Sequence, residues 1–251
     1  MYSISVVIPA FRASKTIVAT INSIVNQTYL PTEVLVILDG PDNEFIEVFK
    51  NANFPIYVRL EELSQNVGVA SARNEGVLRS CGDYIALCDA DDVWHPQKLE
   101  IQVSYIKKGY HLIGTQAIRF EEASELIFRE IERKNIKKYQ EVQSQDLKAY
   151  NPFYTSSLIY DRKMFCDVQF NETCPQEDYQ FLIDIFDRRN FLAVIVKRRL
   201  LGYRILANSR SGNILYSAMN SFFLRKKNFG LKVAIFNLPL YVFNVLHKRF
   251  F

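Results

Sequence analysis

The sequence predicts an α/β fold in which helices flank a mostly parallel central sheet. Short β-branched runs alternate with segments of helical periodicity over the first 108 residues, which is the pattern of βαβ units. The composition, with 49% hydrophobic and 23% charged residues, is that of a globular chain and excludes disordered and collagen-like classes. A chain of 251 residues is long enough to bury one sizeable core.

The first part of the chain predicts four strands and four helices in alternation. The strands are apolar on both sides, as expected for buried parallel strands, and they lie at 4–8, 34–38, 56–60 and 84–88. The helices that follow them are expected at 14–28, 44–51, 69–80 and 96–108. Pro9 stops the first strand, and Pro96 suits the first turn of the fourth helix.

The alternation becomes irregular after residue 110. Residues 121–148 are highly charged and are expected to form a flap or a small strand pair. Strands are expected at 156–160, 191–196 and 200–205, and helices at 176–189 and 208–227. No linker rich in Pro, Gly or Ser divides the chain, so residues 1–221 are expected to form one domain with halves 1–109 and 110–221.

The charges are distributed unevenly. The last acidic residue is Asp187, and the 13 Lys and Arg residues beyond it face no Asp or Glu. A basic, apolar tail over 222–251 suggests an anionic partner, either a membrane surface or a nucleic acid. Because the tail is aliphatic and carries no nucleic-acid motif, we expect no nucleic acid. Its apolar stretch at 233–246 is shorter than the roughly 20 residues of a spanning helix, so we expect it to lie along a membrane surface.

The beginning of the chain lacks the basic region of a signal peptide, and the cysteines lack a disulfide-framework spacing. We therefore expect a cytoplasmic protein, peripheral on the inner face of the cell membrane. Neither G-x-G-x-x-G nor a P-loop sequence is present, which argues against dinucleotide oxidoreductases and P-loop NTPases.

Acidic residues follow two of the expected strands, where ligands of open α/β sheets bind. Asp39 follows one strand, and Asp89, Asp91 and Asp92 follow another. Neighbouring carboxylates raise one another's pKa unless a cation compensates. An i, i+2 pair suits Mg²⁺ or Mn²⁺, whose coordination is usually completed by substrate phosphate oxygens. The alternative is that Asp91 or Asp92 only caps the helix that begins near Pro96.

An ordered set of segments resembles the opening and catalytic segments of the family 2 inverting glycosyltransferases, which have the GT-A fold. These segments are VVIPAF at 6–11, SIVNQT at 23–28, EVLVILDG at 33–40, NVGVASARNEG at 66–76, GDYIALCDADDVW at 82–94 and EDY at 177–179. A lone D-x-D would be weak evidence, whereas the ordered set is specific. The resemblance implies a nucleotide-diphosphate-sugar donor, usually a UDP-sugar, and a divalent cation (Mn²⁺ or Mg²⁺).

The resemblance also implies roles for individual residues. Asp39 would bind the base of the donor, and the pocket around the base would be lined by Pro9, Ala10 and Phe11. The sugar and diphosphate would be contacted by Arg73, Asp89 and Ala90, and the cation would be held by Asp91 with Asp89. The alternatives are that Asp39 only shapes a turn and that Arg73 forms a surface ion pair.

For catalysis, the resemblance implies that Asp178 is the general base, with Glu177 beside it. The alternative is that both acids only stabilise the start of a helix. Two departures from the family pattern stand out: Leu38 precedes Asp39 where a second aspartate is common, and Leu206 replaces a histidine. Arg204 or Arg210 would then supply positive charge near the diphosphate.

The absence of a Q-x-x-R-W motif argues for a single addition rather than processive synthesis. The acceptor implied by bacterial relatives is a polyprenyl-diphosphate-linked glycan in surface polysaccharide biosynthesis. Residues 1–109 would bind the donor and 110–221 the acceptor, while the tail would bring its cations to a membrane: Arg225, Lys226, Lys227, Lys232, Lys248 and Arg249. Alternatives are packing of the tail on the core, a sugar nucleotidyltransferase, or a non-catalytic glycan-binding scaffold.

Overall fold

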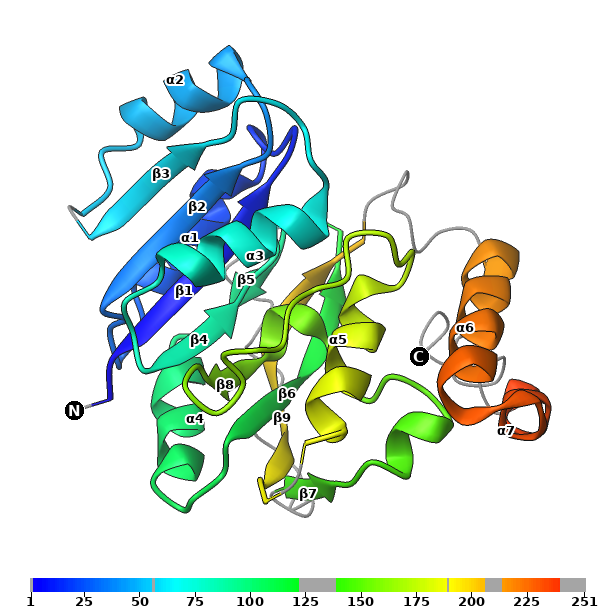
Figure 1. Cartoon of the computed structure of the whole chain (residues 1–251). Helices are drawn as coiled ribbons and strands as arrows, with labels where there is room; N and C mark the ends of the chain where they lie inside the picture. Colours follow the sequence, from blue (N-terminus) through cyan, green and yellow to red (C-terminus); the bar gives the residue numbers. More distant parts are fainter. Residues whose placement is uncertain (1, 56, 122–138, 189, 206–213, 240–251) are drawn as a thin grey trace.

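The computed structural model has one central sheet with helices on both of its faces (Figure 1). The structure describes residues 2–55, 57–121, 139–188, 190–205 and 214–239. Strands from both halves of the chain join in this sheet, in the order β3-β2-β1-β4-β8-β6-β9-β5, and β7 pairs with β9.

The first half of the chain forms the expected alternation. Its elements are β1 (Ile4–Ala10), α1 (Ile17–Val25), β2 (Glu33–Leu38), α2 (Asn43–Asn51), β3 (Val58–Glu62), α3 (Val69–Arg79), β4 (Tyr84–Leu87), β5 (Val93–Trp94) and α4 (Lys98–Ile106). Strands β3, β2, β1 and β4 are parallel neighbours, as predicted. The two-residue strand β5 is too short to give a sequence signal of its own.

The second half adds short antiparallel strands to a sheet in which most strands run in one direction, so the expectation of a mostly parallel sheet is confirmed. Its strands and helices are β6 (Leu112–Phe120), β7 (Tyr139–Val142), η1 (Asp146–Lys148), η2 (Thr155–Ser157), β8 (Ile159–Asp161), α5 (Glu177–Phe186) and β9 (Ala193–Arg204). Strand β8 lies between β4 and β6 and is antiparallel to both. The βαβ rhythm that predicts parallel neighbours ends near residue 110, so it does not govern these strands.

The two strands expected at 191–196 and 200–205 are one strand, β9. The basic residues 197–199 between the two apolar runs do not interrupt it. Two register shifts against β6, on either side of Gln116, accommodate this polar stretch while the pairing continues to Arg204. The expected flap or strand pair at 121–148 falls partly outside the described residues, and its last part forms β7.

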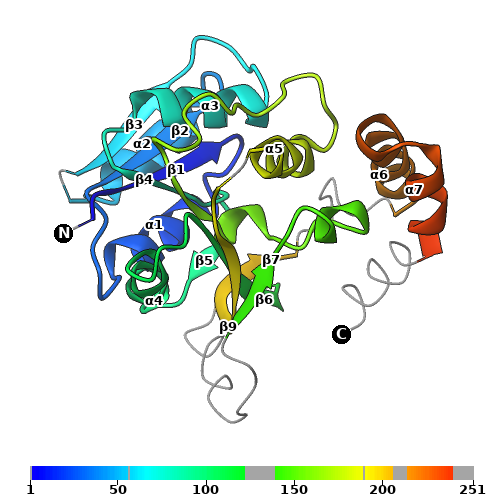
Figure 2. The ribbon, with the colours of Figure 1, turned by 60° about the horizontal axis from the view of Figure 1, so that its bottom comes forward.

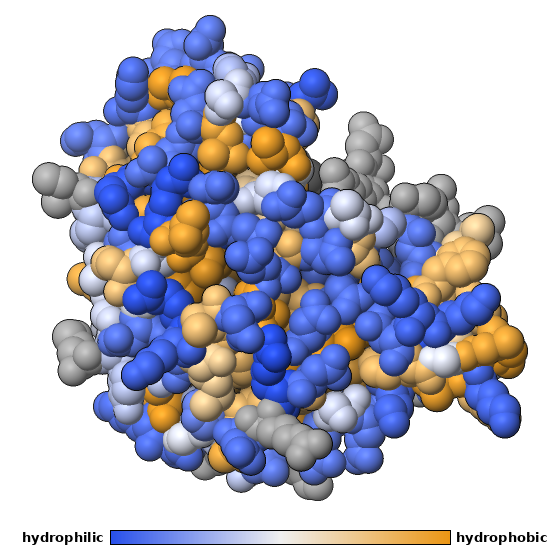
Figure 3. Space-filling model, viewed as in Figure 1, coloured by the Kyte–Doolittle hydropathy of each residue, from blue (hydrophilic) through white to orange (hydrophobic). Residues whose placement is uncertain are grey.

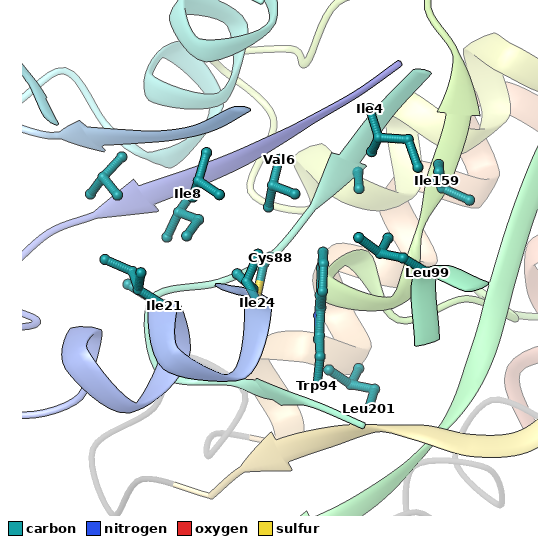
Figure 4. Packing of buried hydrophobic residues seen from close by; sticks show 14 of the residues in the cluster. Ile4, Val6, Ile8, Ile21, Ile24, Cys88, Trp94, Leu99, Ile159 and Leu201 are labelled. Atoms are coloured by element: carbon teal, nitrogen blue, oxygen red, sulfur yellow. The ribbon is translucent and has the colours of Figure 1, made fainter. Parts of the chain in front are cut away.

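The core has two layers because successive side chains of β1 point to opposite faces. Ile4, Val6 and Ile8 pack with α1 and α4, whereas Val7 packs with α3 and α5. Figure 4 shows Trp94 between Ile24, Leu99 and Leu201 in the first layer. Figure 2 shows α1 and α4 on one face of the sheet and α3 and α5 on the other.

The C-terminal region forms α6 (Ile214–Phe229) and α7 (Leu231–Phe236), so the expected tail is helical where it is described. The expected boundary at 221/222 falls within α6. No helix in the described part of the chain is long and apolar enough to cross a membrane. Arg225 is fully buried and donates to the Ala149 carbonyl oxygen at 2.7 Å. The expectation that Arg225 faces a membrane is therefore wrong, because its side chain points into the domain.

We predict that Gly76→Ala destabilises the fold. A Cβ at Gly76 would lie 2.3 Å from Val7 Cγ1, where α3 packs against β1. Overpacking of this kind lowers the free energy of unfolding by about 1–3 kcal/mol, which exceeds the gain in helix propensity of up to about 1 kcal/mol. Urea unfolding measures the change. Leu78→Ala, at a position 77% exposed on the same helix, is the control, and an equal effect of both substitutions would contradict the prediction.

Candidate active site

The carboxyl ends of β1, β2 and β4 lie at the same edge of the sheet, because these strands are parallel neighbours. Hydrogen bonds extend the pairing into the loops: Asp39 N donates to the Ala10 carbonyl at 2.8 Å, and Cys88 N donates to the Val7 carbonyl at 3.1 Å. The predicted segments 9–11, 39–40 and 89–92 are thereby brought to one place on the molecule.

Asp39 is buried and fastens the loop that leads into α3. Its carboxylate accepts from Val67 N at 2.7 Å, from Gly68 N at 3.0 Å and from Asn66 Nδ2 at 3.0 Å. Gly40 has φ 96°, and a Cβ there would lie 2.8 Å from Asn66 N, so glycine is required at this crossing. A carboxylate can accept about four hydrogen bonds, and Asp39 accepts these three from its own chain.

Arg73 joins the loop after β4 to the start of α5. It is 4% exposed, and its Nη2 donates to Asp89 Oδ1 at 2.7 Å while its Nη1 donates to Glu177 Oε1 at 2.9 Å. Burial disfavours the charge of the guanidinium, but the two carboxylates outweigh burial and raise the pKa of Arg73. Arg73 is thus a buried bridge between Asp89 and Glu177, and not a surface ion pair.

The 3-10 turn η2 makes a second link between the same two regions. Ser156 Oγ accepts from Asp89 N at 2.9 Å, and the neighbouring Thr155 Oγ1 donates to Asp178 Oδ2 at 3.4 Å. Asn151 Nδ2 also donates to Asp178 Oδ2, at 3.2 Å. The sequence gives no sign of this turn, which together with Arg73 brings Asp89, Glu177 and Asp178 into one site.

The carboxylates of the loop after β4 are only partly compensated. Burial, followed by the charge of Asp89, raises the pKa of Asp91 to about 6. Burial and the charges of Asp89 and Asp91 raise the pKa of Asp92 well above its ordinary range. Asp92 Oδ1 accepts from Arg204 N at 2.9 Å, and Asp92 Oδ2 is buried with no hydrogen-bond partner among the described residues.

Arg204 holds this loop from the opposite side. Its Nε donates to the Asp91 carbonyl oxygen at 2.8 Å, its Nη1 donates to the Glu121 carbonyl oxygen at 3.3 Å, and its guanidinium carbon lies 4.6 Å from the centre of the Phe120 ring. Arg204 therefore positions the acidic loop. Arg210, the other arginine predicted near the diphosphate, lies outside the described residues.

The end of β1 supplies the remaining predicted donor residues. Pro9 and Ala10 are buried, whereas Phe11 is 53% exposed. Arg12 follows with φ 52°, a left-handed conformation that is uncommon outside glycine, and its guanidinium carbon lies 5.0 Å from the Phe11 ring centre. The carbonyl oxygen of Ala90 accepts hydrogen bonds from the hydroxyls of Thr16 and Thr20 at 2.8 and 3.0 Å.

A polar layer beneath the site escaped sequence reasoning. Lys98 is fully buried, with Nζ 3.7 Å from the centre of the Trp94 ring and 2.8 Å from Gln102 Oε1. Gln102 Nε2 donates to the carbonyl oxygens of Ile113 and Ser157 at 3.0 and 2.8 Å. Burial lowers the pKa of Lys98 to about 7. In the sequence, Lys98 and Gln102 stand four residues apart beside the apolar face of α4. This spacing could have indicated a buried pair, but a lysine at such a position is ordinarily solvated.

The residues present fit a divalent cation that is shared with substrate oxygens. Within the part of the chain that is described, no three His, Cys, Asp or Glu side chains form a complete metal-binding group. Asp91 and Asp92 nevertheless have pKa values raised by burial and by neighbouring negative charge. These carboxylates offer only oxygen ligands, and too little positive charge lies nearby to compensate them. Such a group suits Mg²⁺ or Mn²⁺, which bind through one or two carboxylates plus phosphate oxygens.

Comparison with known sequences agrees with the resemblance. The sequence model of glycosyl transferase family 2 matches residues 5–167. The amylovoran biosynthesis glycosyltransferase AmsB of Erwinia amylovora is 26% identical over 214 residues, which are 81% of this chain and 70% of AmsB. The UDP-Glc:alpha-D-GlcNAc-diphosphoundecaprenol beta-1,3-glucosyltransferase WfgD of Escherichia coli is 36% identical over 108 residues, which are 43% of this chain and 42% of WfgD.

Solved structures confirm the GT-A fold. S. aureus TarS 1-349 in complex with UDP-GlcNAc superposes with a TM-score of 0.69 at 16% identity and covers 96% of this chain and 71% of its own. The mannosyltransferase PcManGT of Pyrobaculum calidifontis, in complex with GDP-Man and Mn²⁺, has a TM-score of 0.67 at 14% identity and covers 98% of this chain and 74% of its own. At these identities the similarity concerns the fold.

We predict that buried Lys98 makes stability depend on pH. Above a pH of about 7 the folded state holds Lys98 neutral, whereas an unfolded lysine stays protonated up to about 10.4. The unfolded state then binds more protons, so the free energy of unfolding should rise with pH. Relative to Lys98→Met, the wild type should gain up to about 1.4 kcal/mol per pH unit above neutrality.

Urea unfolding of both proteins at several pH values measures this slope. Lys50→Met, at an exposed position on α2, is the matched control. If Lys98→Met and Lys50→Met differed from the wild type by the same amount at every pH, the prediction would be wrong.

Proposed function

This chain belongs to glycosyl transferase family 2, and we propose that it transfers one sugar from a UDP-sugar to a lipid-linked oligosaccharide, with inversion at the anomeric carbon. The observation that carries the proposal is the double link between Asp89 and the start of α5, through Arg73 and through η2. It supports a single site in which two groups lie side by side. The acidic loop after β4 would bind the donor diphosphate together with a cation, and Asp178 would accept a proton.

The donor would bind along the carboxyl edge of β1, β2 and β4. The exposed ring of Phe11 offers a stacking surface for a base, with Pro9 and Ala10 behind it, and the remaining acceptor position of Asp39 would take an N–H of the base. A uracil base is proposed because the relative WfgD is named for a UDP-Glc donor.

Asp91, with Asp89, would hold the divalent cation together with the donor diphosphate. When bound, such a cation neutralises the negative charge that grows on the departing diphosphate. Arg204 would keep the Asp91 backbone in place through its 2.8 Å hydrogen bond. Arg73 would set the orientation of Asp89 next to Ala90 and the donor sugar.

Asp178 would take the proton of the acceptor hydroxyl as it attacks the face opposite to the diphosphate. Its hydrogen-bond partners Asn151 and Thr155 are neutral groups that orient the carboxylate without neutralising it. Glu177 is bound to Arg73 instead, which favours Asp178 over Glu177 as the base. A positioned base typically contributes ~10²–10⁴ in rate.

The acceptor would be held by residues 110–221, with 1–109 as the donor-binding half. A polyprenyl-diphosphate-linked glycan is proposed because the name of WfgD specifies a diphosphoundecaprenol acceptor, and AmsB is named for the synthesis of amylovoran. Such an acceptor would place the protein on the cytoplasmic face of the cell membrane, with its basic C-terminal region against the lipid.

We predict that Asp178→Asn lowers kcat by ~10²–10⁴, because it removes the proton acceptor while it keeps the shape of the side chain. Steady-state kinetics with the accepted donor measure the change, and UDP affinity should be unaffected. Asp187→Asn, at the end of the same helix, is the control. Turnover of Asp178→Asn close to that of the wild type would refute the role of Asp178 as base.

We also predict that a panel of nucleotide sugars will show release of nucleoside diphosphate from a UDP-sugar. EDTA should abolish this release, and Mn²⁺ or Mg²⁺ should restore it.

Asp91→Asn should weaken cation-dependent UDP binding in calorimetry, whereas Asp146→Asn, in η1, should not. Release that is indifferent to EDTA would contradict the cation, and no cation-dependent nucleotide binding at all would indicate a non-catalytic scaffold.

A further inference from the structure

Helix α6 is anchored to the domain by one of its faces. Ser221, Leu224 and Arg225 are buried on this face, and Leu224 belongs to the core layer that contains α5. Asn228 Nδ2 donates to Gln180 Oε1 of α5 at 2.9 Å. The orientation of α6 is thereby fixed, and the opposite face must point away from the domain.

The outward side of α6 and α7 is apolar. Met219 and Phe223 of α6 are 58% and 56% exposed, and Leu231, Ile235 and Phe236 of α7 are 51%, 55% and 82% exposed. Figure 3 shows apolar side chains gathered over α6 and α7 at the right-hand edge of the molecule. Single exposed apolar residues are ordinary, but a contiguous group of them marks an interaction surface.

The charges on the same two helices are all positive. Lys226, Lys227 and Lys232 are exposed, and residues 214–239 contain no Asp or Glu. Large apolar side chains among lysines suit an anionic lipid surface, where the lysines meet the head groups and the apolar side chains enter the acyl boundary. With 16 and 6 residues, α6 and α7 would lie along such a surface.

A second copy of the chain fits this surface less well. In a two-fold dimer this patch meets itself, and residues 214–239 contain no acidic side chain that could pair with the three lysines. Lysine is also depleted at protein–protein interfaces. The distribution of charge therefore favours lipid over a partner subunit.

We infer that α6 and α7 dock on anionic membrane through Met219, Phe223, Leu231, Ile235 and Phe236, ringed by Lys226, Lys227 and Lys232. This face, the docking face, would hold the protein at the membrane that carries the lipid-linked acceptor of the proposed function, on which this part of the inference rests. Gln176 Nε2, directly before Glu177, donates to the Ser217 carbonyl oxygen of α6 at 3.3 Å. Helix α6 thus contacts the residue that precedes the helix carrying Asp178.

Vesicle co-sedimentation of the full chain tests the inference. The wild type should bind vesicles of phosphatidylglycerol and phosphatidylcholine, more weakly in high salt, and should bind pure phosphatidylcholine poorly. Phe223→Ser combined with Ile235→Ser and Phe236→Ser should lower the partition coefficient at least roughly tenfold, because the inserted apolar area is lost. Leu78→Ser, at an exposed position on α3, should leave binding unchanged.

The charge contribution has its own variant. Lys226→Gln with Lys227→Gln and Lys232→Gln should abolish the preference for phosphatidylglycerol, and circular dichroism should show that both triple variants are folded. Equal vesicle binding by the wild type and the apolar triple variant would overturn the inference. So would sedimentation equilibrium showing a wild-type dimer that the apolar triple variant converts to a monomer, which would assign the face to a second copy.

The outcome for the docking face is separable from the outcome for the proposed function. A triple variant that loses vesicle binding should still release nucleoside diphosphate in detergent solution, since Asp91 and Asp178 are untouched. A wild type that binds vesicles but releases nothing from any nucleotide sugar would count against the proposed function and leave the docking face standing.

Discussion

The arrangement of the site depends on the buried ion pairs of Arg73. A guanidinium at 4% exposure is tolerable only if its charge is matched, and the carboxylates that match it come from the loop after β4 and from the first turn of α5. Arg73 and Glu177 are 104 residues apart in the chain, and their ion pair holds the two segments together. Separating them would leave a buried charge without its partner, which costs free energy.

The same interaction divides the acidic residues into groups with different chemistry. Asp89 and Glu177 share the single positive charge of Arg73. Burial and the nearby charge of Asp89 raise the pKa of Asp91 to about 6, which suits a carboxylate that is to share a cation with a diphosphate. Asp178 is oriented by neutral donors, which suits a carboxylate that is to receive a proton.

The sequence predicted those elements whose position is set by short stretches of neighbouring residues. Strands β1, β2 and β4 and the acids behind them were predicted because apolar runs and turn residues are local signals. Other features depend on contacts between residues distant in sequence. They are the strand direction of β8, the continuity of β9 past 197–199, and the burial of Lys98 and Arg225. A basic residue beside a helix surface gives the same sequence signal whether it is solvated or buried, so only the three-dimensional structure distinguishes Arg225 from Lys226.

Hydrogen–deuterium exchange of the wild type and Arg73→Met tests the bridge most directly. If Arg73 holds the site together, the substitution should speed exchange both in residues 89–92 and in the first turn of α5, while the amides of β1 and β2 keep their protection. Unchanged exchange in those two segments, in a variant that is folded, would contradict the account.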